Sequence, residues 1–103
     1  MFGTIAKLKF KPGSFDKMQN QMKEFEDRDA KGFMFTAVYR STSDPNEAWL
    51  VVGFEDEASY RANADDPETD KMATQMRELL AAPPEWNDGE IVSMRRAGER
   101  AST

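Results

Sequence analysis

The strongest constraint on the fold is the order in which two kinds of segment follow one another along the 103 residues. One kind has the hydrophobic period of two that is typical of strands, and the other has the hydrophobic period of a helix. Residues 2–10 alternate between apolar side chains and lysines, which is typical of a half-buried strand. A helical period follows Ser14, which is expected to be the N-cap. Gly32 is expected to end this helix, because glycine adopts positive φ without strain. The apolar residues of the helix recur at spacings of three and four: Phe15, Met18, Met22 and Phe25.

The next two apolar segments predict a β-hairpin. Residues 33–42 are rich in aromatic and β-branched side chains, as strands are. Residues 43–47 contain Asp44, Pro45 and Asn46, which favour a turn. Residues 48–54 are almost continuously apolar, which is expected of a strand covered on both faces.

The last third of the chain predicts two helices and a fourth strand. A short helix is expected from residue 55 to residue 64, and a second helix starts at Asp66-Pro67, where Asp caps and Pro takes the first helical position. Pro83-Pro84 should end the second helix. Residues 87–89 then lead into a strand at residues 90–94. The second helix carries an apolar stripe of Met72, Met76, Leu79 and Leu80.

The predicted order is therefore β-α-β-β-α-β, an α+β arrangement of the ferredoxin-like type with one four-stranded antiparallel sheet. We expect one domain over residues 1–96 and a flexible tail over residues 97–103. Both helices should cover the same face of the sheet. Because residues 48–54 are apolar on both faces, we expect a second copy of the chain to cover the other face, forming a homodimer by sheet-to-sheet packing.

Histidine and cysteine are both absent. Without cysteine the chain cannot form a disulfide, a thiolate zinc site or an iron–sulfur cluster. Without histidine it cannot build a Ser-His-Asp triad or ligate haem through imidazole. Because 19 acidic residues outnumber 14 basic ones, giving a net charge of −5, we expect no binding to nucleic acid.

The sequence also bears on location. No apolar run approaches the length of a membrane span, so we expect no membrane association. Lys7 and Lys9 interrupt the segment where a signal peptide would need continuous apolar residues. Together with the absence of cysteine, these features predict a cytoplasmic protein.

Acidic side chains are concentrated between residues 55 and 70. Carboxylate oxygens suit Ca²⁺ or Mg²⁺, but the glycine-centred spacing of an EF-hand is missing. We therefore expect helix caps and a solvated surface here, and no metal site. The residues are Glu55, Asp56, Glu57, Asp65, Asp66, Glu68 and Asp70.

Several of these segments together resemble a known family. They are residues 2–10 and the Pro12-Gly13-Ser14 segment that follows them, the pair Gly32-Phe33, and the stretch Trp49–Tyr60. The spacing from this stretch through Met72 and Met76 to Glu90-Ile91-Val92 fits the same pattern. This pattern, over residues 1–96, resembles the antibiotic biosynthesis monooxygenase (ABM) domain of the dimeric α+β barrel superfamily.

The resemblance implies a homodimer whose two sheets close into a barrel, with a small-molecule pocket between the sheet and helices of each subunit. It implies a cofactor-independent monooxygenase acting on an aromatic or quinol-type small molecule. The alternative is a non-catalytic barrel protein that binds a hydrophobic ligand or has a structural role. A third hypothesis is an isomerase or another non-oxidative barrel enzyme.

This sequence departs from two patterns of the family. Many similar sequences carry a His in the short helix where Asn63 stands here. The haem-degrading branch uses an Asn on its first strand, a Trp in the short helix and a haem-ligating His in the next helix. Those positions fall near Ala6, Asn63 and Ala73, so the resemblance does not extend to haem degradation.

The resemblance and the residue chemistry give seven candidate site residues. Asn63, Tyr60 and Arg40 are candidates for catalytic contacts, because amide, phenol and guanidinium groups supply hydrogen bonds without histidine. No cofactor is expected. The candidates for substrate binding are Trp49, Trp86, Met72 and Met76.

Each candidate has a structural alternative. Asn63 also fits an exposed helix position. Aromatic residues such as Trp49, Tyr60 and Trp86 are more often packing residues, and Arg40 more often forms a salt bridge. A helical methionine stripe is more often plain core than a ligand surface.

Overall fold

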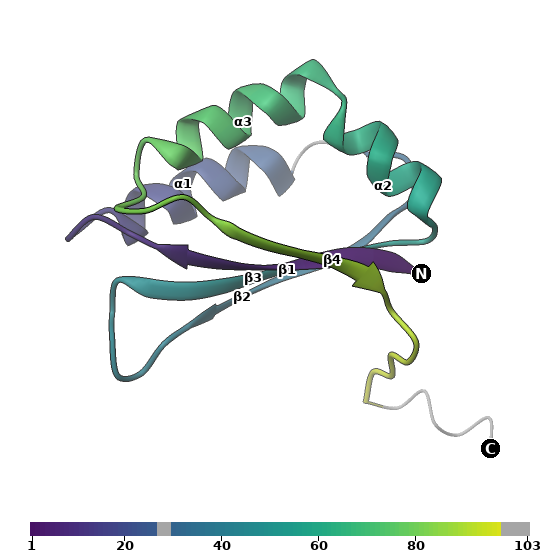
Figure 1. Ribbon diagram of the computed structural model, residues 1–103, viewed down its shortest axis with the longest axis horizontal. Coiled ribbons are helices and arrows are strands. Elements are labelled where there is room, and N and C mark those ends of the chain that lie inside the picture. The colour runs from purple at the N-terminus through teal and green to yellow at the C-terminus, as the bar shows by residue number, and fades with distance from the viewer. Residues whose placement is uncertain (27–29, 98–103) are drawn as a thin grey trace.

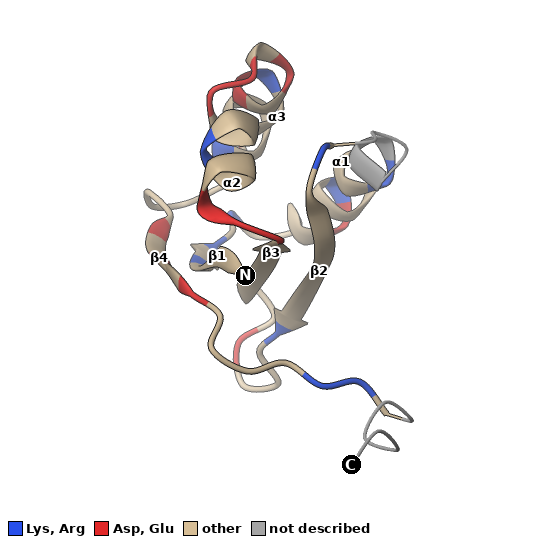
Figure 2. Ribbon diagram, turned by 90° about the vertical axis from the view of Figure 1, so that its right-hand side faces the viewer, with Lys and Arg blue, Asp and Glu red and all other residues tan. Residues whose placement is uncertain are grey.

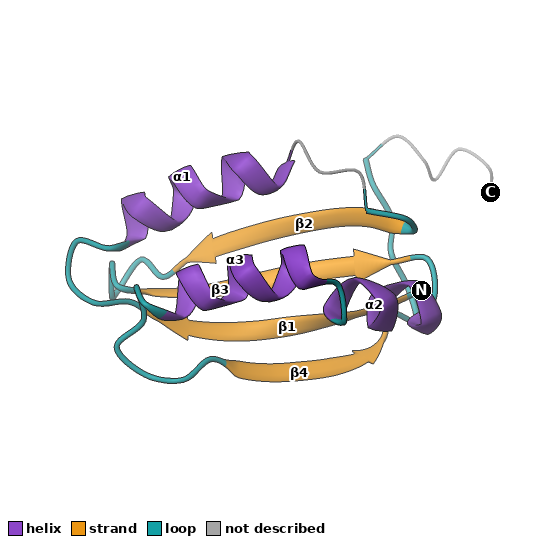
Figure 3. Cartoon of the chain, turned by 90° about the horizontal axis from the view of Figure 1, so that it is seen from above, coloured by secondary structure: helices purple, strands orange, loops and turns teal. Residues whose placement is uncertain are grey.

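The computed structural model describes residues 1–26 and 30–97. It contains a four-stranded antiparallel sheet with strand order β2-β3-β1-β4, which confirms the α+β ferredoxin-like fold. Three helices cover one face of this sheet (Figures 1 and 3). The elements are β1 (Phe2–Lys9), α1 (Phe15–Glu26), β2 (Phe33–Arg40), β3 (Glu47–Phe54), α2 (Glu57–Ala64), α3 (Pro67–Arg77) and β4 (Glu85–Glu90).

The core lies between the sheet and the helices and follows the predicted period of two in β1. Thr4, Ala6 and Leu8 are buried, while Ile5, between Thr4 and Ala6, is exposed on the opposite face. Phe10 continues the buried row, and its ring meets that of Phe15 edge-on with 5.6 Å between centroids. Figure 2 shows α1 on one side and α2 with α3 on the other, all above the same face of the sheet. The buried cluster is Ala6, Leu8, Phe10, Phe15, Met18, Ala48 and Leu80.

The prediction for the fourth strand was wrong in position. The strand spans Glu85–Glu90 rather than residues 90–94, and it pairs with β1 so that Asp88 lies opposite Thr4. Residues 87–89, predicted from the sequence to be the connection, lie inside the strand. Pairing with β1 supplies the backbone hydrogen bonds that override the turn preference of Asn-Asp-Gly.

The second predicted helix ends earlier than expected. α3 stops at Arg77, before Pro83-Pro84. The reason is tertiary: the Leu79 carbonyl accepts a hydrogen bond from the Lys11 backbone N–H, and the Ala81 N–H donates to the Lys9 carbonyl. These bonds to the end of β1 draw the chain out of the helix and place Leu80 in the core.

Helix caps account for part of the acidic segment, as predicted. The Asp56 carboxylate accepts a 2.7 Å hydrogen bond from the Ser59 N–H at the start of α2. Asp66 accepts one of 2.9 Å from the Glu68 N–H at the start of α3. The hydrogen bond from the Ser59 N–H lowers the pKa of the Asp56 carboxyl below its ordinary value. Across the described ranges, no group of three or more acidic, His or Cys side chains is arranged to hold a metal ion.

The face of the sheet away from the helices is partly apolar. Tyr39 of β2 lies opposite Trp49 of β3, and Ile5 lies opposite Val51. Tyr39 is 63% exposed and Ile5 is 50% exposed.

Among the described helices, none is long and apolar enough to cross a membrane. Except for Ala97, the predicted C-terminal tail lies outside the described residues.

Candidate functional site

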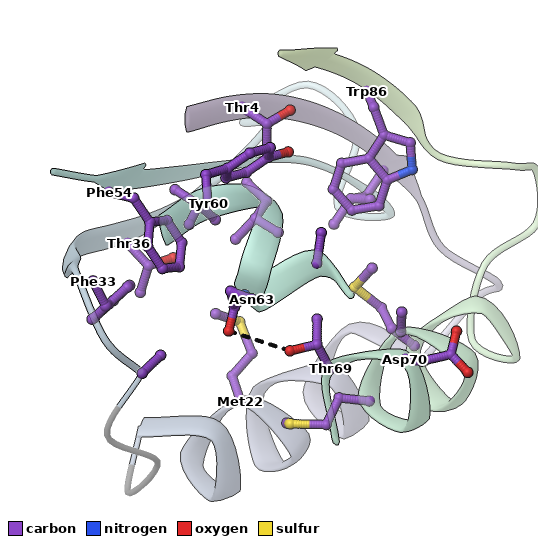
Figure 4. A pocket seen from close by; sticks show the side chains of 18 of the residues that line it. Thr4, Met22, Phe33, Thr36, Phe54, Tyr60, Asn63, Thr69, Asp70 and Trp86 are labelled. Carbon is purple, nitrogen blue, oxygen red and sulfur yellow. Dashed lines mark hydrogen bonds between the residues drawn. The ribbon is translucent and has the colours of Figure 1, made fainter. Parts of the chain in front are cut away.

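A cavity of about 800 Å³ lies between the sheet and the helix layer (Figure 4). Pockets of about 300–1,000 Å³ that combine apolar walls with a few polar groups commonly bind small organic molecules. All three helices and all four strands contribute to its wall. Its apolar lining includes Leu8, Met22, Leu50, Phe54, Met72 and Met76.

Four polar side chains converge at the end of the cavity formed by α2, β1 and β4. The Tyr60 hydroxyl donates a 2.8 Å hydrogen bond to Oδ1 of Asp88. The other carboxylate oxygen of Asp88 accepts a hydrogen bond from Nη1 of Arg61 at 3.3 Å. Thr4 lies beside this pair, because it is the β1 residue opposite Asp88. Figure 4 shows the hydroxyls of Thr4 and Tyr60 close to each other.

This arrangement shifts the pKa values of Tyr60 and Asp88 in opposite directions. Burial of the phenol and its hydrogen bond to Asp88 raise the pKa of Tyr60 to about 12. The hydrogen bond from Tyr60, the neighbouring Thr4 hydroxyl and the Arg61 cation lower the pKa of Asp88. At neutral pH Tyr60 is therefore a neutral hydrogen-bond donor and Asp88 is a carboxylate.

Aromatic contacts fix the position of Tyr60. Its ring lies 5.2 Å from that of Phe2 and 5.8 Å from that of Phe54, measured between centroids. The Arg61 guanidinium lies over the Phe2 ring at 5.4 Å. Tilted ring pairs and cation–π contacts of this kind restrict side-chain rotation. Tyr60 is therefore held with its hydroxyl toward β4.

Asn63 lies at the other side of the cavity, near the junction of α2 and α3. Its Oδ1 accepts a 3.3 Å hydrogen bond from the Thr69 hydroxyl, drawn as a dashed line in Figure 4. Its side chain is half-buried, and it lines the cavity. The amide therefore has contact with the cavity and is anchored by the first turn of α3.

The structure brings five of the seven candidate residues to one cavity. These are Asn63, Tyr60, Trp86, Met72 and Met76.

Arg40 and Trp49 are not among the residues that line this cavity. The Arg40 guanidinium lies 4.4 Å from the centroid of the Phe15 ring, and its Nε donates to the Pro45 carbonyl. Within residues 1–26 and 30–97, Arg40 therefore makes packing and backbone contacts rather than the expected salt bridge. Trp49 lies opposite Lys7 and Tyr39, so it belongs to the sheet face away from the helices.

Three residues at the polar end escaped prediction. Thr4 could have been noticed as the one hydroxyl in a buried row that continues with Ala6 and Leu8. Asp88 lies two residues after Trp86 and therefore on the same face of β4, but the turn preference of the Asn-Asp-Gly segment does not predict a strand there. Arg61 follows Tyr60 in a short amphipathic helix, and no sequence pattern distinguishes it from a surface arginine.

Comparisons with known proteins agree with this fold. A family model described as "Antibiotic biosynthesis monooxygenase" matches residues 1–75. No curated protein matches the chain significantly in sequence.

Several solved structures are similar over most of the chain. A conserved protein from Methanosarcina mazei Go1 has 20% identity and a TM-score of 0.76, covering 85% of this chain and 89% of its own. An antibiotic biosynthesis monooxygenase has 14% identity and a TM-score of 0.75, covering 90% and 100%. A mutant of SnoaB, a cofactor-independent oxygenase from Streptomyces nogalater, has 17% identity and a TM-score of 0.75, covering 90% and 94%. At these identities the likeness supports the fold, and the family match over residues 1–75 of 103 shows that the chain belongs to the antibiotic biosynthesis monooxygenase family.

Proposed function

We propose that this protein is a monooxygenase that needs no cofactor and oxidises an aromatic phenol or quinol bound in the cavity. The observation that carries the proposal is the cavity itself, whose volume is about 800 Å³ and whose apolar walls enclose a polar end. Such a space fits a polycyclic ring system with its oxygen substituents near Tyr60 and Arg61. Membership of the family supports the reaction class.

The chemistry requires little from the protein. An electron-rich phenolate can itself reduce O₂, so the oxidant is O₂ and the reductant is the substrate. One oxygen atom forms a new C–O bond at a ring carbon, the other leaves as water, and a phenol plus O₂ gives a quinone plus water. The protein must bind and orient the ring and stabilise the developing negative charge.

The cavity residues match these tasks. Trp86, Met72 and Met76 would pack against the ring faces and edges, since aromatic and thioether groups make adaptable apolar walls. The Tyr60 oxygen would accept a hydrogen bond from a substrate hydroxyl, because its own proton is donated to Asp88. The Asn63 amide would contact the substrate from the opposite side.

A second candidate function is ligand binding without turnover. Its support is the absence of histidine, since histidine alone has an ordinary side-chain pKa near neutrality. Tyr60 is held neutral, and Asp88 is held as a carboxylate by two donors. In this case the same cavity would hold a hydrophobic ligand unchanged.

We also propose that the functional unit is a homodimer joined through the open sheet face. Tyr39, Trp49 and Val51 lie on this face with Ile5, and they form an apolar surface beside the Lys7–Glu47 ion pair. A second copy would bury this surface in the way that the chain's own helices bury the other face.

A cytoplasmic location is likewise proposed, on the composition alone.

Oxygen consumption with a panel of hydroquinones and polycyclic phenols tests the activity. We expect wild-type protein to consume O₂ faster than buffer and Asn63→Ala to lower kcat about 100-fold, as loss of a charge-stabilising donor does. Asn20→Ala is the matched control, because Asn20 lies exposed on α1 and outside the cavity. Consumption equal to the buffer blank with every substrate would favour ligand binding without turnover.

A further inference from the structure

We propose that Thr4, Tyr60 and Asp88 form a subsite that recognises a neutral hydroxyl group of the bound ligand. The inference rests on the proposed function only in placing a small molecule in the cavity. It concerns the end of the cavity between β1, β4 and α2, where Thr4 and Asp88 are paired across the two strands.

The first observation is the state of the Thr4 hydroxyl. Thr4 is 5% exposed and lines the cavity. Its Oγ1 is buried and makes no hydrogen bond of acceptable geometry in the described part of the chain, although it lies close enough to Tyr60 and Asp88 to lower the pKa of both. A buried hydroxyl without a partner costs free energy, because it has lost its hydrogen bonds to water. A ligand group that reaches Thr4 would restore one.

The second observation is the mixture of donors and acceptors beside Thr4. The Tyr60 proton is already committed to Asp88, so the phenol oxygen is left as an acceptor. Asp88 accepts from Tyr60 and Arg61, and each carboxylate oxygen has a further lone pair. Thr4 can both donate and accept. A hydroxyl suits this set, because it can accept from Thr4 and donate to Asp88 at once.

Charge makes the subsite selective. Asp88 and Arg61 already compensate each other as an ion pair, so the Asp88 carboxylate next to Thr4 would repel a ligand carboxylate, and a ligand ammonium would have to compete with Arg61 for Asp88. The Asp88 side chain is 34% exposed, so water weakens both effects without removing them. A neutral hydroxyl is the polar group that meets neither penalty.

Calorimetric titration of the full chain tests the subsite independently of turnover. The probes are 2-naphthol, 2-methoxynaphthalene, which cannot donate a hydrogen bond, and 2-naphthoate, which carries a negative charge. We expect 2-naphthol to bind about 10-fold more tightly than either of the others, the difference that one good hydrogen bond supplies. Asp88→Asn should narrow the difference between 2-naphthol and 2-naphthoate.

Variants at Thr4 and Thr36 test whether the preference for 2-naphthol arises at the Thr4 hydroxyl. Thr4→Val keeps the shape of the side chain and should reduce the preference over 2-methoxynaphthalene to about 3-fold or less, while Thr4→Ser should restore it. Thr36→Val is the matched control, since the Thr36 hydroxyl, in the same cavity, already donates to the Val51 carbonyl. It should leave the preference unchanged.

The outcomes separate this inference from the proposed function. An equal preference in Thr4→Val and wild type, or no binding of any probe, would overturn the subsite. A preference that disappears in Thr4→Val and returns in Thr4→Ser would support it. If that pattern appears but no phenol consumes O₂, the subsite stands and the oxygenase proposal fails.

Discussion

The hydroxyl of Tyr60 in α2 donates a 2.8 Å hydrogen bond to the carboxylate of Asp88 in β4, 28 residues further along the chain. This bond joins the helix layer to an edge strand of the sheet. The residues are distant in sequence because β4 returns to pair with β1 after α3. The polar end of the cavity is thus assembled by topology.

The Tyr60–Asp88 bond should contribute measurably to stability. We expect Tyr60→Phe and Asp88→Asn each to lower the free energy of unfolding by about 1 kcal/mol, since the bond involves a charged acceptor but is partly exposed to water. A double-mutant cycle by urea denaturation should give a coupling energy of about 0.5–1.5 kcal/mol. Strictly additive losses would mean that the two side chains do not interact in solution.

Stability should fall at high pH because the pKa of Tyr60 is raised to about 12 in the folded protein from its ordinary value of 10.0. The folded state holds the phenolic proton more tightly than the unfolded state does. This contribution is complete below about pH 10 and is lost as the pH rises toward 12. Urea unfolding at about pH 8 and about pH 11 should show a larger loss for wild type than for Tyr60→Phe. Equal losses would contradict a raised pKa.

Two glycines with positive φ should respond differently to substitution by alanine. Gly13 has φ of 78° and nothing within 4 Å of an added Cβ, whereas at Gly32, with φ of 80°, the Cβ would lie 2.5 Å from the side chain of Ser59. Gly13→Ala should cost about 1 kcal/mol from backbone strain. Gly32→Ala should cost clearly more, because the clash adds to the strain. Thermal unfolding of both variants checks this order, and equal shifts in Tm would refute it.

The open sheet face should control the oligomeric state. We expect wild-type protein to sediment at twice its chain mass of 11.7 kDa at micromolar concentration. Ile5→Glu introduces a charge in the centre of the exposed apolar face and should shift the protein toward monomer. Gln19→Glu adds the same charge to an exposed position of α1 and should leave the dimer intact. A monomeric wild type would contradict the proposed dimer.

Much of the fold was predictable because it depends on local periodicity. The alternation in residues 2–10 and the helical stripe starting at Phe15 agree with β1 and α1. Asp66 and Pro67 form the predicted start of α3. Element ends were less predictable: α3 stops at Arg77 because the following residues bond to the end of β1.

The candidate site was predictable in part. The family resemblance and the chemistry of their side chains point to Asn63 and Tyr60, and both line the cavity. Only residue type points to Trp49 and Arg40, and the structure gives them other neighbours. Residue type does not reveal which face of a sheet a strand residue occupies unless the register is known.

The sequence by itself determined the order of the elements, the α+β class and the buried row of β1, because hydrophobic periods act over a few residues at a time. Only the tertiary structure decided that β4 pairs over Glu85–Glu90, and that pairing places Asp88 beside Thr4 and Tyr60. Strand register depends on contacts between residues far apart in the chain, and a shift of one residue would turn Asp88 to the opposite face. The polar end of the cavity is therefore a product of register, which no local pattern in the sequence encodes.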